Sequence, residues 1–216
     1  MSESNSFARH TALIDKFFRI LIVSMAVAIL TACGGGGGSE ARSVVVVFGD
    51  SLSNNNGQFV TSNEHWTEKL KAERPGSTIV VSALSGETAA DAVKRLPSVL
   101  ATHRPTHIII SHGTNDYWRA CRGCYAQTQK HLEDMAMIAN ENGVVVILGD
   151  MTYKRGGPPE ASAYSAMYRS AAGATGSRYV NMVANIPYDR VHYHSDMIHY
   201  NNNSQEALKN SVVNTF

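Results

Sequence analysis

Residues 43–53 read SVVVVFGDSLS. The apolar run is continuous rather than alternating, which is typical of a strand buried on both faces of a parallel sheet. It stops at Gly49, so a polar turn containing Asp50 and Ser51 follows the strand directly. In open α/β sheets, ligands bind beyond the carboxyl ends of the strands. The stretch therefore predicts a buried first strand with a functional group at its end.

Four more short apolar runs alternate with amphipathic stretches along the chain. Strands are predicted at Thr78–Val81, His107–Ile110, Val144–Leu148 and Arg178–Val180. Helices are predicted at Glu64–Arg74, at Glu87–Leu96, through Leu132, Met135 and Ile138 to Asn142-Gly143, at Pro159–Ala172, and from Ser204 as N-cap to Val212. This alternation predicts an α/β fold, a three-layer α/β/α sandwich around a mainly parallel five-stranded sheet.

Length and charge narrow the classes of function. The 216 residues suit one domain with a sizeable core and give no support to two full domains with a linker. The 19 lysines and arginines nearly balance the 18 aspartates and glutamates, and no basic run is interleaved with aromatic residues. Nucleic acid is therefore not expected as a partner.

The N-terminus has the features of an export signal. The apolar run Ile20–Leu30 follows three cationic residues and is shorter than the ~20 residues of a membrane-spanning helix. It ends in Leu30-Thr31-Ala32-Cys33, which resembles the bacterial lipobox, in which the cysteine is lipidated and becomes the mature N-terminus. An ordinary signal peptide with a chance cysteine is the alternative. We expect an exported protein anchored to a membrane through Cys33, at the outer membrane if the host is Gram-negative.

A glycine-rich segment separates this signal from the predicted domain. Gly34–Gly38 suit a flexible tether better than a phosphate-binding loop, because such a loop needs a strand before it and a helix after it. The predicted organisation is a signal peptide over residues 1–32, a lipidated cysteine and tether over 33–42, and a catalytic domain over 43–216.

A nucleophile and a base stand at opposite ends of the predicted domain. A serine hydroxyl such as that of Ser51 needs a base within hydrogen-bond reach, and the base must itself be oriented by a third group. Near the C-terminus, Asp196 and His199 are three residues apart, so a turn can point carboxylate and imidazole the same way. The carboxylate would stabilise the imidazolium that forms when His199 takes the serine proton.

Two further segments supply donors for an oxyanion hole, which stabilises the charge that develops in acyl transfer. Gly86 follows the second predicted strand and offers a backbone N–H with no side chain in the way. Asn115, in the segment Gly113-Thr114-Asn115-Asp116 after the third predicted strand, offers a side-chain amide.

Together these segments resemble the four blocks of the SGNH hydrolases, also called GDSL esterases. The blocks occur in order as Gly49-Asp50-Ser51-Leu52-Ser53, then Gly86, then Gly113–Asp116, then Asp196-x-x-His199. The resemblance implies a flavodoxin-like sandwich in which Ser51 is the nucleophile, His199 the general base and Asp196 its orienting group. It also implies an oxyanion hole made by the N–H groups of Ser51 and Gly86 and the side chain of Asn115.

The implied reaction is hydrolysis of an acyl ester through an acyl-enzyme, with no metal or organic cofactor. Asn54–Asn56 and Tyr117–Arg119 are expected to line the cleft, which favours a short acyl group, such as acetyl, on a polar or carbohydrate alcohol. The alternatives are a lipase or lysophospholipase of the same fold and a non-catalytic lipoprotein that binds acylated glycans.

A histidine cluster and a pair of cysteines suggest two further kinds of site. His192, His194, Asp196 and His199 form a cluster that suits zinc, but a metal site has no need for the other three blocks. Cys121 and Cys124 lie close in sequence in a chain expected to be exported, so they predict a local structural disulfide rather than a redox or haem site.

Overall fold

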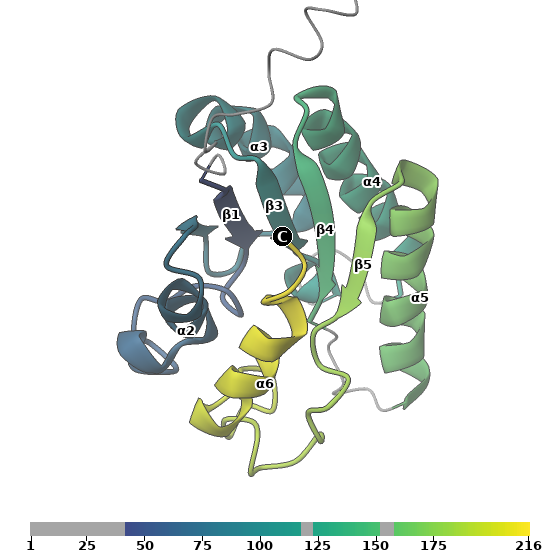
Figure 1. The fold of residues 1–216 in the computed structure, drawn as a ribbon. Coiled ribbons are helices and arrows are strands. Elements are labelled where there is room, and N and C mark those ends of the chain that lie inside the picture. Colours follow the sequence, from purple (N-terminus) through teal and green to yellow (C-terminus); the bar gives the residue numbers. More distant parts are fainter. Residues whose placement is uncertain (1–41, 118–122, 152–157) are drawn as a thin grey trace, which may run out of the picture. The chain divides into compact units, whose positions relative to one another are not determined.

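The fold is a five-stranded parallel sheet with helices on both faces (Figure 1). The computed structural model describes residues 42–117, 123–151 and 158–216. Its strands run in the spatial order β2-β1-β3-β4-β5, and all pairs are parallel. The predicted fold class is thus confirmed. In chain order the elements are β1 (Val44–Gly49), the 3-10 turn η1 (Ser62–Glu64), α2 (Trp66–Glu73), β2 (Thr78–Ala83), α3 (Ala89–His103), β3 (His107–Ser111), α4 (Tyr125–Glu141), β4 (Val145–Asp150), α5 (Pro158–Thr175), β5 (Arg178–Asn181) and α6 (Asn202–Val212).

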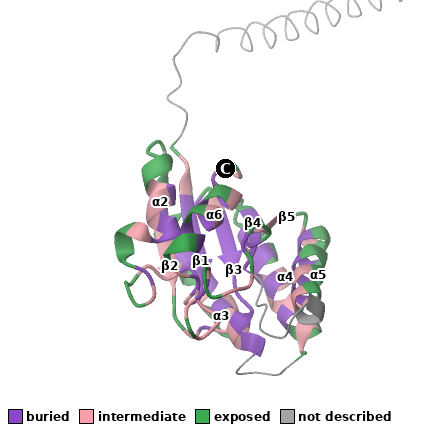
Figure 2. Ribbon diagram, turned by 90° about the horizontal axis from the view of Figure 1, so that it is seen from below, coloured by how far each residue is buried: buried purple, intermediate pink, exposed green. Residues whose placement is uncertain are grey.

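The valine run of β1 is buried because the sheet is covered on both sides. Val46 and Phe48 belong to the core beneath α3, α4 and α5, whereas Val45 and Val47 belong to the core beneath α2 and α6. Alternate residues of a strand point to opposite faces, so each face of β1 needs its own apolar set. Figure 2 shows these buried residues along the strands and the exposed residues on the outer helix surfaces.

Helix α3 is longer than its sequence pattern predicts. The predicted helix ends at Leu96, yet α3 continues to His103 with Pro97 inside it. A proline in a helix interior costs about 3 kcal/mol. Val99 and Leu100 beyond it are buried in the core, and burial of such side chains is worth about 1.5–3 kcal/mol each. Packing therefore outweighs the local preference.

The predicted N-cap of α6 was wrong. The cap is Asn201, whose side-chain oxygen accepts a hydrogen bond from Asn203 N at 3.0 Å. Ser204 lies inside the helix, fully buried, and its hydroxyl donates to His192 O at 2.6 Å. Both residue types favour caps, so the tertiary contact of Ser204 decided between them.

The strand order places the loops after three strands at one edge of the sheet. From β1 the chain passes to β2 on one side and then to β3 on the other, which makes the carboxyl end of β1 a topological switch point. The polar turns after β1, β2 and β3 meet there. Within the described ranges, no helix is both long enough and apolar enough to cross a membrane.

Candidate active site

The turn that carries Ser51 requires glycine before it. A Cβ atom at Gly49 would lie 2.6 Å from Ser111 Oγ and 2.7 Å from Ser53 Oγ, two atoms that share a 2.8 Å hydrogen bond. After Gly49 the chain turns tightly, with Leu52 N donating to Asp50 Oδ1 at 3.0 Å. The turn presents Ser51 at the carboxyl edge of the sheet.

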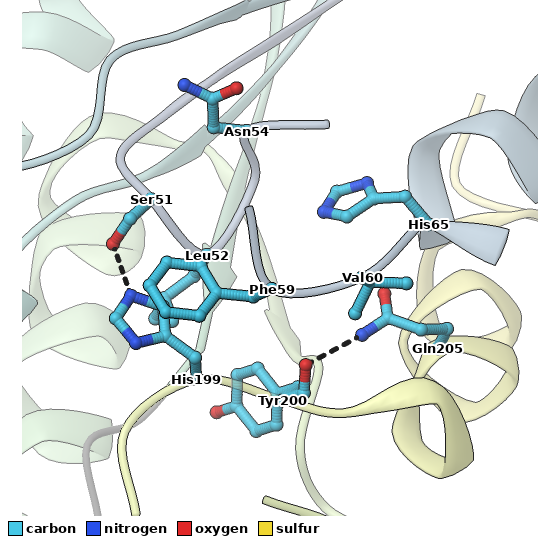
Figure 3. Close-up of a pocket in the computed structure, with 9 residues that line it drawn as sticks. All are labelled: Ser51, Leu52, Asn54, Phe59, Val60, His65, His199, Tyr200 and Gln205. Carbon is cyan, nitrogen blue, oxygen red and sulfur yellow. Dashed lines mark hydrogen bonds between the residues drawn. The ribbon is translucent and has the colours of Figure 1, made fainter. Parts of the chain in front are cut away.

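Ser51 faces a histidine from the other end of the chain. His199 Nε2 lies 2.9 Å from Ser51 Oγ (Figure 3). On the other side of the ring, His199 Nδ1 lies 2.7 Å from Asp196 Oδ2. The fold thus brings together residues 148 positions apart in one hydrogen-bonded chain. This arrangement allows the imidazole to take a proton from the serine while the carboxylate holds the opposite ring nitrogen.

A short turn fixes Asp196 and His199 relative to each other. Asp196 Oδ1 accepts hydrogen bonds from Ile198 N at 2.9 Å and His199 N at 3.1 Å. Between them, Met197 has a φ of 58°, in the left-handed region that non-glycine residues rarely adopt. The turn is therefore held by its hydrogen bonds against a local preference, as is common at functional sites.

The two ionisable partners have shifted pKa values. Burial lowers the pKa of His199 below its ordinary value, and this outweighs Asp196, which raises it. For Asp196, burial opposes ionisation, but the hydrogen bonds from the His199 ring and two backbone N–H groups outweigh burial and lower its pKa. At neutral pH the histidine is therefore a neutral base beside a carboxylate.

The expected oxyanion donors lie next to one another. Gly86 sits in a turn with a φ of 82°, which favours glycine. Asn115 reaches both neighbouring segments, because its Nδ2 donates to Glu87 O at 3.0 Å and to Asp50 Oδ2 at 3.1 Å. These contacts tie the amide to the residues beside Gly86 and Ser51. Both N–H bonds of Asn115 have protein acceptors, so an oxyanion would share one of them.

Asp50 was not singled out from the sequence, although it lies in the nucleophile block. It is 1% exposed, and its two oxygens hold Leu52 N and Asn115 Nδ2. Burial raises the pKa of Asp50 to about 6, despite the nearby His112, which lowers it. The carboxylate therefore links the nucleophile turn to the amide of Asn115, and its position before a catalytic serine was an available signal.

A buried ion cluster beneath the site was also missed. Glu87 accepts two hydrogen bonds from Arg95, each 2.6 Å long, and a third contact joins it to His112 Nε2 at 3.0 Å. Arg95 also lies 4.3 Å from the centre of the Phe48 ring. Burial opposes ionisation of Glu87, but its bonds to Arg95 and His112 outweigh that and lower its pKa. Helical spacing gave no hint of this pairing, because residues eight apart on a helix are not neighbours, and in the structure Glu87 precedes α3.

Phe59 is the third residue that the sequence did not reveal. Its ring stacks on that of His199, with centroids 3.4 Å apart and planes 8° apart (Figure 3). It also helps to line a pocket beside Ser51 with a volume of only about 10 Å³. Leu52, Asn54, Val60, His65, His199, Tyr200 and Gln205 line the rest of it. An aromatic residue in a polar loop carries no sequence pattern that would place it there.

The expected cleft lining was partly wrong. Asn54 lines the pocket beside Ser51, but the Asn55 side chain donates to Glu68 on α2. Tyr117 is 6% exposed and packs in the core near Tyr164, with ring centroids 6.1 Å apart, because the chain buries its ring beneath α5. Residues 118 and 119 lie outside the described ranges.

The histidines that could have formed a zinc site have different partners in the structure. His192 Nδ1 pairs with Asp189 at 2.7 Å, whereas His199 faces Ser51, and no group of three or more potential ligands in the described parts of the chain is arranged to hold a metal ion. Cys124 is disulfide-bonded. Cys121 and Cys33 lie outside the described residues, so the Cys121–Cys124 pairing and the lipidation stay predictions.

Comparisons of the sequence with a family profile and with known proteins agree on the family. The sequence profile of the GDSL-like Lipase/Acylhydrolase family matches residues 47–207. Esterase TesA of Pseudomonas aeruginosa is 32% identical over 133 residues, which cover 59% of this chain and 64% of that protein. Thioesterase 1/protease 1/lysophospholipase L1 of Escherichia coli K12 is 33% identical over 73 residues, or 33% of this chain and 34% of that protein.

The solved structures agree with the sequence comparisons. A crystal structure of TesA superposes with a TM-score of 0.71 at 27% identity, covering 78% of this chain and 95% of that one. The sequence matches span about two thirds or less of the curated relatives, while the family profile spans most of the described residues. The chain therefore belongs to the GDSL-like lipase/acylhydrolase family.

Proposed function

We propose that this protein is a serine esterase that hydrolyses carboxylic esters through Ser51, His199 and Asp196. The observation that carries the proposal is the continuous hydrogen-bonded chain, 2.9 Å from Ser51 Oγ to His199 Nε2 and 2.7 Å from His199 Nδ1 to Asp196. A relative named as an esterase supports the same class of reaction.

The geometry suits a two-step acyl transfer. Ser51 Oγ attacks the ester carbonyl while His199 Nε2 takes its proton, and the carbonyl oxygen becomes an oxyanion held by the N–H groups of Ser51 and Gly86 and by Asn115. The intermediate collapses, the alcohol leaves with the proton from His199, and Ser51 keeps the acyl group. Water, activated by His199, then releases the acid and restores the serine.

The size of the pocket favours a short acyl group such as acetyl. Its volume of about 10 Å³ leaves no space for a chain of several carbons. A lysophospholipase-type activity is the second candidate, because the E. coli relative bears that name. That reaction would require space for a long chain beside Ser51, so rates on ethyl esters of increasing acyl length separate the two candidates.

Covalent labelling tests the nucleophile and distinguishes an esterase from a protein that only binds acylated glycans. We expect a fluorophosphonate to add once to the native protein, on the peptide containing Ser51, because that hydroxyl is paired at 2.9 Å with a neutral imidazole that Asp196 holds from the other side. Mass spectrometry of the digested protein locates the label. Heat-denatured protein is the control and should not react. A native protein that stays unlabelled would contradict the proposal.

The pH dependence of the rate reports on His199. The base must be neutral, and burial lowers the pKa of His199 below 6.5, so kcat/KM should rise with pH and level off before neutrality. Asp196→Asn removes the group that raises this pKa, so the midpoint of the acid limb should move to lower pH while the plateau rate falls. Initial rates on ethyl acetate from pH 4 to 8 measure both. An acid limb centred above pH 6.5 would be incompatible with His199 as the base.

We also propose that the protein is exported and held at a membrane by lipid on Cys33. The support is the sequence Leu30-Thr31-Ala32-Cys33 after a short apolar run. Cys33→Ser should shift the protein from the membrane to the soluble fraction in a bacterial host that processes lipoproteins. Ser39→Ala in the tether is the control and should stay with the membrane. Membrane association unchanged in Cys33→Ser would rule out the anchor.

A further inference from the structure

A second, larger hollow adjoins the proposed catalytic centre. It is a shallow groove with a volume of about 440 Å³, within the range of small-molecule sites. The residues that line it are Phe59, Thr61, His194, Asn201, Asn202 and Asn203. Phe59 lines both this groove and the pocket beside Ser51, and its ring stacks on His199. Phe59 thus connects the groove to the proposed general base.

The position of the groove relates it to the alcohol half of an ester. The leaving oxygen takes its proton from His199 Nε2, so the alcohol must lie beside the His199 ring in the proposed reaction. Phe59 covers the face of that ring at a centroid distance of 3.4 Å. An alcohol that extends past Phe59 enters the groove, whereas the pocket of about 10 Å³ beside Ser51 has space only for a small acyl group.

The groove carries polar groups that are available to a ligand. Thr61 and Asn202 are exposed, and within the described parts of the chain their side chains form no hydrogen bond with another residue. His194 Nε2 also has no partner there, but it is buried and so is not open to a ligand. Asn201 and Asn203, by contrast, use their amide nitrogens to hold Val191 O, at 2.9 and 2.7 Å. Fixed amides thus stand beside free donors and acceptors.

The composition of the lining selects among ligand classes. Phe59 is the only apolar side chain of the six, so a long hydrocarbon chain would have a single apolar side chain to pack against. None of the six is lysine or arginine, so a phosphate group would lack a cation to pair with. Amide and hydroxyl groups beside an aromatic ring suit a neutral molecule that offers several hydroxyls next to apolar C–H groups.

We propose that this groove is the alcohol subsite and that it binds a sugar whose hydroxyl carries the acyl group. The inference rests on the proposed esterase function and deepens it by naming the class of alcohol. Thr61 and Asn202 hydrogen-bond sugar hydroxyls, and Phe59 packs against the sugar ring. A simple alcohol such as ethanol leaves the groove unused.

The test compares two esters of the same acid, 6-O-acetylglucose and ethyl acetate. We define the ratio as kcat/KM for the sugar ester divided by kcat/KM for ethyl acetate. Asn202→Ala should lower this ratio by about three- to tenfold, the effect of losing one hydrogen bond. The double variant Thr61→Val/Asn202→Ala should lower the ratio further, by more than about tenfold. The matched control is Asn210→Ala, an exposed asparagine on the same helix outside the groove, which should leave the ratio unchanged.

The possible results separate this inference from the proposed function. A ratio that does not move in the double variant, or equal losses on both esters, would overturn the sugar subsite even though hydrolysis depends on Ser51. A changed preference between ethyl acetate and ethyl octanoate, without a change in the sugar ratio, would assign the groove to the acyl chain and also overturn it. Hydrolysis of ethyl acetate that survives Ser51→Ala would instead refute the esterase proposal. Melting temperatures of the variants confirm that each one is folded.

Discussion

Ser51→Ala is expected to lower kcat on ethyl acetate by about 10⁵-fold, equivalent to about 7 kcal/mol of transition-state stabilisation. The variant loses the only oxygen within reach of His199 Nε2 among the described residues, so no acyl-enzyme can form. A residual rate above that in water remains expected, since the oxyanion donors stay in place.

The variant also tests whether Ser51 and His199 act as one unit. The double variant Ser51→Ala/His199→Ala should be no slower than Ser51→Ala alone, because the histidine has no proton to take once the hydroxyl is gone. Ser98→Ala, an exposed serine on α3, serves as the control and should keep the full rate. Activity above one tenth of the starting value in Ser51→Ala would exclude Ser51 as the nucleophile.

Glu87→Ala is expected to destabilise the fold by about 3–5 kcal/mol, the typical effect of removing one partner of a buried ion pair. Glu87 and Arg95 have side chains only 6% and 22% exposed, and the substitution leaves the Arg95 cation and His112 without their carboxylate. In a domain of this size such a loss lowers the melting temperature by roughly 10 °C. Urea unfolding at pH 7 measures the free energy directly.

The pH dependence of this loss has a definite sign. The folded protein lowers the pKa of Glu87, so its contribution to stability is present above the unfolded value of 4.5 and is lost as pH falls through the folded value. The stability difference between the two proteins should therefore shrink in acid. Lys94→Ala, which removes an exposed ion pair on α3, the helix that carries Arg95, should cost under about 1 kcal/mol. An equal effect of the two substitutions would show that burial of the Glu87 cluster contributes nothing.

The elements of the fold were predictable wherever one local pattern dominated. The run Val44–Val47 has no polar residue on either face, so it could only be a fully buried strand. At Pro97 and Ser204, by contrast, the local signals for a helix boundary were misleading. The burial of Val99 and Leu100 carried α3 past the proline, and a contact with His192 drew Ser204 into α6.

Some residues of the candidate site could likewise be predicted from local sequence patterns, and others could not. Ser51, Gly86, Asn115, Asp196 and His199 could be named because they stand in four short motifs. Phe59 and Glu87 could not, because no short motif contains both Phe59 and His199, and the eight-residue interval between Glu87 and Arg95 matches no regular helical contact.

By itself, the sequence determined the class of fold, the order of its strands and helices along the chain, and the residue types available for chemistry. These follow from local periodicity and turn chemistry, which need no distant contact. Only the tertiary structure decided the 2.9 Å contact of Ser51 with His199, the stacking of Phe59, and the polar groove beyond it. Their physical origin is the packing of separate elements around a switch point in the sheet, which brings together side chains far apart in the sequence.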